Sequence, residues 1–199
     1  MIPSLKNLTV VLASESPRRL VLLKQIGLDP IVEVSGYDEK MDQITVSAAE
    51  FVKECSKGKA AAVAERLKQE NRPFDVIIGC DTVIEFEGKI IGKPKDDADA
   101  IKTLKMLSGN THNCLTGLTL IDSKFNELTS VTQTEVVFAN ISDEVLQKYI
   151  ELGEHRGCAG SYRIQGSAAA FIRSINGCFN NVVGLPIQVL CEQMQQMLK

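Results

Sequence analysis

The run Val76-Ile-Ile-Gly-Cys-Asp-Thr82 constrains the fold most strongly, because its apolar part has the length and character of a strand. A continuous apolar run of this kind is typical of a strand buried on both faces of a sheet. Asp81 interrupts it, and a buried carboxylate is costly unless it is paired, hydrogen-bonded or bound to metal. We expect Asp81 and Thr82 to present a base or metal ligand to a cleft, with a purely structural role for Asp81 as the alternative.

A strand, a tight loop and a helix start follow one another near the N-terminus. Val10 to Ala13 predict a buried strand, and Ser16-Pro17 predict a helix start with a serine cap. Arg18 and Arg19 then fall in the first helical turn, where the backbone N–H groups already favour anions. Together with the hydroxyl of Ser14, these groups could bind a phosphate. The alternative is that both arginines point into water.

The rest of the chain alternates helical and strand patterns. Helices are expected at about 17–26, 47–68 and 97–107, after Ser142 and from about Pro186, and strands at 30–34, 75–86, 89–92, 113–121, 128–138 and 169–175. Thr116-Gly117 inside a strand predicts a bulge or a close approach of backbone.

Three further polar residues have two interpretations each. Lys59 lies on the apolar stripe of the second helix, so its ammonium either enters a cleft or reaches water along the stripe's edge. Lys93, held extended by Pro94, either points at the same anion or ends a strand. Gln165 lies in the glycine-bearing loop 157–166, and its amide could match a base edge or serve an ordinary loop.

Composition narrows the classes of function. A length of 199 residues predicts one domain or two small lobes. A net charge of −3 argues against a generic binder of nucleic acid or membrane surfaces. No apolar run spans a bilayer, so we expect a cytoplasmic protein. The six cysteines lack C-x-x-C spacing and predict reduced, mostly buried thiols. Two histidines make a Ser-His-Asp or multi-histidine metal site improbable.

Local cations combined with hard oxygen ligands indicate one type of chemistry. The cations are Arg18, Arg19, Lys59 and Lys93, and the carboxylates are Asp81 and Glu39. This set suits metal-assisted attack of water on a polyphosphate. The chain has neither a G-x-x-x-x-G-K-[ST] loop nor a G-x-S-x-G elbow, which argues against a P-loop ATPase and a serine hydrolase.

The chain resembles the Maf family of nucleoside triphosphate pyrophosphatases through motifs that run in family order from one end to the other. They are Leu12-Ala-Ser-Glu-Ser-Pro-Arg-Arg19, Gly79-Cys-Asp-Thr82, Gly92-Lys-Pro94, Leu107-Ser-Gly109, Thr116-Gly117, Ala159-Gly-Ser-Tyr-Arg-Ile-Gln-Gly166 and Val183-Gly-Leu-Pro186. The resemblance implies an elongated α/β fold, with a mixed β-sheet flanked by helices and two lobes around a central cleft. It also implies a single domain over residues 1–199, a divalent cation (Mg²⁺, Mn²⁺ or Co²⁺) and a homodimer.

The resemblance also implies roles for individual residues. Asp81 corresponds to the proton acceptor, and Ser14, Glu39, Lys59 and Lys93 to positions lining the phosphate and metal site, with Glu39 and Asp81 near the metal. The combination of Arg18, Thr82 and Gln165 is similar to the branch that acts on dTTP and UTP.

Two departures from the family pattern concern residues next to the motifs. Cys80 replaces the usual alanine. Arg163 replaces a glycine that is common in the Gln165 loop, and it would strain the loop if that position needs a positive φ.

The alternative function is a non-catalytic protein that senses nucleotides or regulates cell division.

Overall fold

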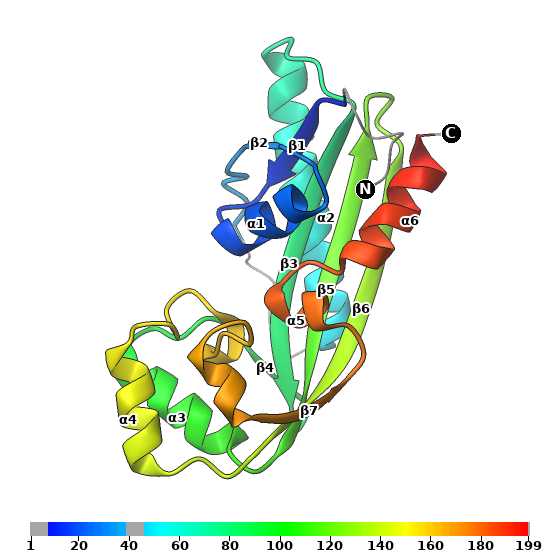
Figure 1. Ribbon diagram of the computed structural model, residues 1–199. Coiled ribbons are helices and arrows are strands. Elements are labelled where there is room, and N and C mark those ends of the chain that lie inside the picture. The colour runs from blue at the N-terminus through cyan, green and yellow to red at the C-terminus, as the bar shows by residue number, and fades with distance from the viewer. Residues whose placement is uncertain (1–7, 39–45, 199) are drawn as a thin grey trace.

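The computed structural model describes residues 8–38 and 46–198, which form a mixed α/β fold around one seven-stranded sheet (Figure 1). The strand order is β2-β1-β3-β5-β6-β7, and β4 pairs with β3 beside this path. β1 pairs in parallel with β2 and β3, and the other pairs are antiparallel. The strands are β1 (Val10–Ala13), β2 (Ile31–Val32), β3 (Val76–Phe86), β4 (Lys89–Ile91), β5 (Thr111–Asp122), β6 (Glu127–Phe138) and β7 (Ile172–Asn176).

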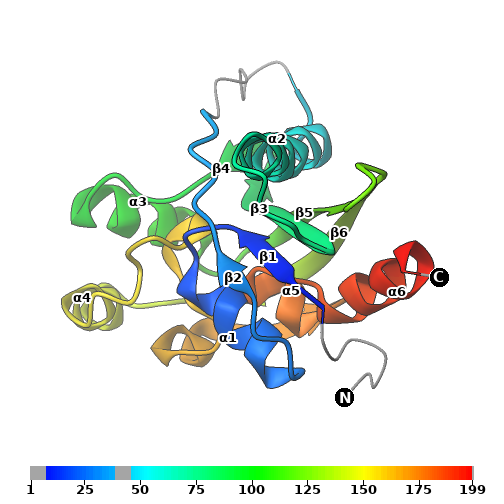
Figure 2. The ribbon, with the colours of Figure 1, turned by 90° about the horizontal axis from the view of Figure 1, so that it is seen from above.

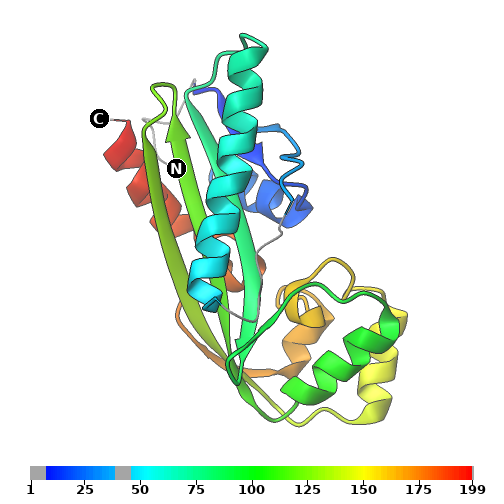
Figure 3. The ribbon, with the colours of Figure 1, turned by 180° about the vertical axis from the view of Figure 1, so that it is seen from behind.

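Helices cover both faces of the sheet and build a second lobe at one end of it. The helix α2 crosses one face, and α1, α5 and α6 lie on the other (Figures 2 and 3). The second lobe contains α3, α4, β4 and two short 3₁₀ turns at the far end of the long strands (Figure 1). The helices are α1 (Pro17–Gln25), α2 (Ala48–Gln69), α3 (Asp97–Leu107), α4 (Asp143–Glu151), α5 (Phe179–Val183) and α6 (Ile187–Met197).

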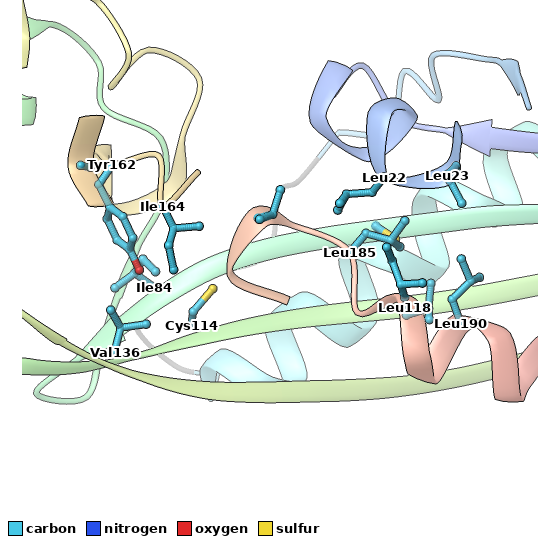
Figure 4. Close-up of a cluster of buried hydrophobic side chains, with 14 of the residues drawn as sticks. Leu22, Leu23, Ile84, Cys114, Leu118, Val136, Tyr162, Ile164, Leu185 and Leu190 are labelled. Carbon is cyan, nitrogen blue, oxygen red and sulfur yellow. The ribbon is translucent and has the colours of Figure 1, made fainter. Parts of the chain in front are cut away.

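The largest hydrophobic core runs through both lobes without a break. At one end Leu22 and Leu23 of α1 pack with Leu185 and Leu118, and at the other end Tyr162 packs near Ile84 and Val136 (Figure 4). Two smaller clusters lie between α2 and the sheet. Burial therefore fixes the sheet between its helices and joins the second lobe to the same core.

Most of the expected elements are present, and the exceptions have local causes. The strand expected at 169–175 begins only at Ile172, because Ser167–Phe171 form a 3₁₀ helix, with Ala169 N–H bonded to the carbonyl of Gly166. Three consecutive alanines lack the β-branched side chains that favour a strand. Ser16 is the N-cap of α1 by backbone conformation, but its side chain makes no capping hydrogen bond. The short helix α5 was not expected from the sequence.

The six cysteines are all free thiols, four of them buried, as their spacing predicted. Burial raises the pKa of the Cys80 thiol to about 11. Within residues 8–38 and 46–198, no helix combines the length and apolar character needed to cross a bilayer.

Candidate functional site

A cleft of about 530 Å³ lies between the first lobe, which carries β1, α1 and α2, and the loop 156–165 of the second lobe. Eight of the residues expected to form a site line it: Ser14, Arg18, Arg19, Lys59, Asp81, Thr82, Lys93 and Gln165. They come from the loop after β1, from α1, α2 and β3, from the chain after β4, and from the loop of the second lobe. Glu39 lies outside the described residues. The sequence motifs therefore converge on one concave surface.

Lys59 and Asp81 form an ion pair across the interface of α2 and β3. Lys59 Nζ lies 2.5 Å from Asp81 Oδ1, and the two side chains are 14% and 10% exposed. The Lys59 ammonium thus points into the protein and not into bulk water. A charge-assisted hydrogen bond of this kind is short and strong, and it holds the carboxylate in one orientation. No described residue bonds to Oδ2 of Asp81, so this oxygen is available to the cleft.

Arg19 is buried and joins three separate segments. Its Nε donates to the carbonyl of Gly184 at 2.8 Å, and its two terminal nitrogens donate to Ser14 Oγ at 2.9 Å and to Thr82 Oγ1 at 3.0 Å. The interpretation that this arginine points into water is therefore wrong. A guanidinium has five N–H groups, so two are left to face an anion.

The hydrogen-bond network around Arg19 fixes the direction of two hydroxyl protons. A carbonyl oxygen can only accept, so Thr116 donates its one hydroxyl proton to the backbone carbonyl of Asn181, at 3.3 Å. In the contact between Thr82 and Thr116, at 2.9 Å, the donor is therefore Thr82. Ser14 Oγ accepts from Arg19 and from the N–H of Ser16, at 3.2 Å. Both acceptor positions of Ser14 are filled, and its proton is left to donate. Ser14 can therefore donate to a phosphate, whereas Thr82 can only accept.

Arg18 spans the cleft. One of its terminal nitrogens donates to the carbonyl of Gly157, in the second lobe, at 2.7 Å. Burial lowers the pKa of its guanidinium, but an arginine keeps its charge in a protein. Lys93 and Gln165 are exposed and also line the cleft. One wall thus carries the buried Lys59–Asp81 pair, and exposed polar groups from the second lobe face the same space.

The loop that carries Gln165 shows no strain at Arg163. The positive φ angles of this loop fall on Gly157 (67°), Gly160 (67°) and Ser161 (65°), and Arg163 is not among the residues with positive φ. The strain expected from the replaced glycine is therefore not present. A side chain at Gly160 would meet Ile84 at 2.6 Å, so this glycine lets the loop pack on the end of β3.

The oxygen ligands of the cleft fit a cation that the substrate helps to hold. Its described carboxylates are Asp81 and Glu15, and no group of three His, Cys, Asp or Glu side chains forms a complete cage within the described residues. Magnesium is usually bound through one or two carboxylates and substrate phosphates. The two histidines have other partners, since His112 contacts the hydroxyl of Tyr162 and His155 contacts Asp97.

A hydrogen-bond network below the cleft was not expected from the sequence. Asn181, fully buried, donates to the carbonyl of Cys114 at 3.1 Å and to Thr134 at 3.0 Å. Asparagine in an apolar stretch before Gly184 was the available signal. The close backbone approach expected at Gly117 is present, against α2.

Comparison with known proteins supplies the family. The model of the family described as Maf-like protein matches residues 9–197. A dTTP/UTP pyrophosphatase of Clostridium acetobutylicum is 44% identical over 91% of this chain and 94% of its own length. Another from Clostridium novyi is 42% identical over 91% and 93%. The solved structure of the Staphylococcus aureus Ham1 protein aligns at a TM-score of 0.44 and 19% identity, over 66% of this chain and 72% of that one. By its sequence from Thr9 to Met197, this chain belongs to the Maf-like protein family.

Proposed function

We propose that this protein is a nucleoside triphosphate pyrophosphatase that hydrolyses dTTP and UTP to the monophosphate and pyrophosphate. The names of its relatives support the substrate. The observation that carries the chemistry is the Lys59–Asp81 pair, which lies in a cleft with further cations and with no P-loop motif in the chain. This set of groups can bind a triphosphate and take a proton from water.

In this proposal Asp81 is the proton acceptor. Lys59 holds Oδ1, so Oδ2 takes the proton of the water that attacks the α-phosphorus. Ser14 donates its hydroxyl proton to a phosphate oxygen, because both of its acceptor positions are filled. Lys93 and the two free N–H groups of Arg19 neutralise the charge that develops on the pyrophosphate leaving group.

A divalent cation belongs to the same proposal. Glu39 and the substrate phosphates would hold it, with Asp81 beside it, since the family resemblance places both carboxylates near the metal. When bound, such a cation neutralises phosphate charge and lowers the pKa of a bound water. The homodimer that the family resemblance implies and the cytoplasmic location also belong to the proposal.

Base selection is proposed for Gln165 of the second lobe, with Thr82 of β3 as a second contact. The amide of Gln165 is exposed to the cleft and offers two donors and one acceptor, which can match a pyrimidine edge. Thr82 contributes only an acceptor, because its proton is directed to Thr116. Arg18 positions the Gln165 loop through Gly157.

The test is a panel of normal and modified nucleoside triphosphates with Mg²⁺, Mn²⁺ or Co²⁺, with products separated by chromatography. We expect pyrophosphate and monophosphate from dTTP and UTP. Hydrolysis in ¹⁸O-labelled water should place the label in the monophosphate, which locates the attack on the α-phosphorus. Release of orthophosphate and a diphosphate would contradict the proposal. Stoichiometric binding without turnover would favour the regulatory alternative.

A further inference from the structure

The middle of α2 rests on a part of the sheet that has no bulky side chains. Alternation along each strand places Gly79 and Asp81 of β3, and Gly117 and Thr119 of β5, on the face that α2 covers. The register pairs Asp81 with Gly117 and Gly79 with Thr119. On either side of this set, larger residues of the same two strands pack under α2, namely Val83, Leu115, Ile77 and Ile121. The helix is therefore closest to the sheet beside Asp81.

The two glycines meet backbone atoms of α2 directly. A Cβ at Gly117 would lie 2.1 Å from the carbonyl oxygen of Val52, and one at Gly79 would lie 2.3 Å from that of Ser56. Real Cβ atoms essentially never come closer than 3.0 Å to such atoms. Rotation of a side chain cannot relieve a clash with a carbonyl, so a methyl group at either position has to move the helix or the strand.

Lys59 belongs to the same stretch of helix. It follows Ser56 by three residues and Val52 by seven, so all three lie on one face of α2. Ser56 Oγ also lies 2.9 Å from Thr119 Oγ1, in a buried contact that depends on the same distance between helix and sheet. Lys59 Nζ reaches Asp81 Oδ1 at 2.5 Å with the helix at this height.

We propose that Gly117 and Gly79 are positioning residues for the Lys59–Asp81 pair. They set the distance between α2 and the strands β3 and β5. This distance in turn allows the Lys59 ammonium to contact the Asp81 carboxylate. The catalytic consequence rests on the function proposed above, whereas the structural consequence does not. Thr119 supports the same spacing through the contact of its hydroxyl with Ser56.

The first test measures the ion pair without any substrate. A double-mutant cycle of Lys59→Met and Asp81→Asn, read by urea unfolding, gives the coupling between the two side chains. We expect this coupling in the protein with Gly117 and its loss in the Gly117→Ala background. An unchanged coupling in that background would overturn the proposal, whether or not the protein hydrolyses dTTP.

The second test measures turnover. We expect Gly117→Ala to lower kcat/KM for dTTP at least tenfold, and the double variant Gly117→Ala/Lys59→Ala to be no worse than Lys59→Ala alone. Effects that multiply would mean that Gly117 does not act through Lys59, and would overturn the proposal. If the wild type does not turn over dTTP or UTP, the proposed function fails. The double-mutant cycle measured by urea unfolding still decides the role of Gly117.

Two further variants serve as control and as reserve. Val63→Ala removes buried atoms from α2 one turn beyond Lys59, and should lower the urea midpoint with less than a twofold change in kcat/KM. If Gly117→Ala does not fold, Thr119→Val removes the Ser56 contact, together with the one to Thr129 on β6, without adding bulk. It should weaken the Lys59–Asp81 coupling by a smaller amount, and an unchanged coupling would again count against the proposal.

Discussion

Arg19 donates a hydrogen bond to Thr82 at 3.0 Å, although 63 residues separate the two along the chain. The contact joins the helix after β1 to the strand that carries Asp81. The Thr82 hydroxyl has no proton left for a ligand, because it donates that proton to Thr116. Thr82 is therefore part of the support of the site as well as part of its surface.

Replacing Thr82 separates these two contributions. Thr82→Val leaves a buried arginine N–H without its acceptor, and we expect it to lower the free energy of unfolding by about 1–3 kcal/mol. Thr82→Ser keeps the hydroxyl and should lose much less. Urea denaturation of both variants beside the wild type measures the difference. No loss in Thr82→Val would mean that the hydrogen bond does not stabilise this position, and a large loss in Thr82→Ser would show that the methyl group does.

Removing the charge of Asp81 should abolish most turnover and leave the fold intact. Asp81→Asn has nearly the same shape but cannot accept a proton, so we expect kcat to fall by roughly 10²–10⁴. Asp75→Asn is the matched control, since Asp75 is a structural carboxylate directly before β3 that accepts from the N–H of Thr9 at 2.6 Å. The control should change stability and not kcat. A folded Asp81→Asn protein with near-normal turnover would refute the assignment.

Phosphate binding and base selection should respond to different substitutions. Lys93→Ala removes a point charge that binds phosphate and does not contact the base. The value of kcat/KM should therefore fall by a similar factor for every nucleotide. Gln165→Glu changes a donor into an acceptor, and we expect the ratio of kcat/KM for UTP over GTP to fall about tenfold or more. Lys95→Ala, two residues from Lys93 and outside the cleft, is the control. A drop of equal size for all bases in Gln165→Glu would indicate that this residue only shapes its loop.

The free energy of unfolding should fall in mild acid, because His112 is buried and binds a proton less readily in the folded protein. Burial lowers the pKa of this histidine to about 4, whereas the unfolded chain has a value near 6.5. The unfolded state therefore binds more protons between these values, so its population rises as the pH falls through this range. From pH 7 to pH 5 we expect the loss to be about 2 kcal/mol greater in the wild type than in His112→Gln. Parallel pH dependences in urea unfolding would exclude His112 as the cause.

Features set by neighbouring residues were predictable from the sequence, and features set by distant contacts were not. The long strands and α2 follow from apolar periodicity, and the buried Asp81 was visible because it interrupts such a pattern. The partner of Arg19 at Gly184 is 165 residues away, so local sequence could not show that this arginine is enclosed. Arg163 illustrates the same limit, since its backbone conformation depends on how the loop packs against β3.

The continuous core has a consequence for how a ligand enters. Leu22 of the first lobe and Leu104 of the second belong to one cluster of buried side chains, and β3, β5 and β6 extend along it (Figures 1 and 4). Swinging the lobes apart about a hinge would expose this core to water, at about 25 cal/mol for each Å² of apolar surface. We therefore expect the width of the cleft to be preorganised by the stiffness of the sheet, with entry and release left to side chains at its rim.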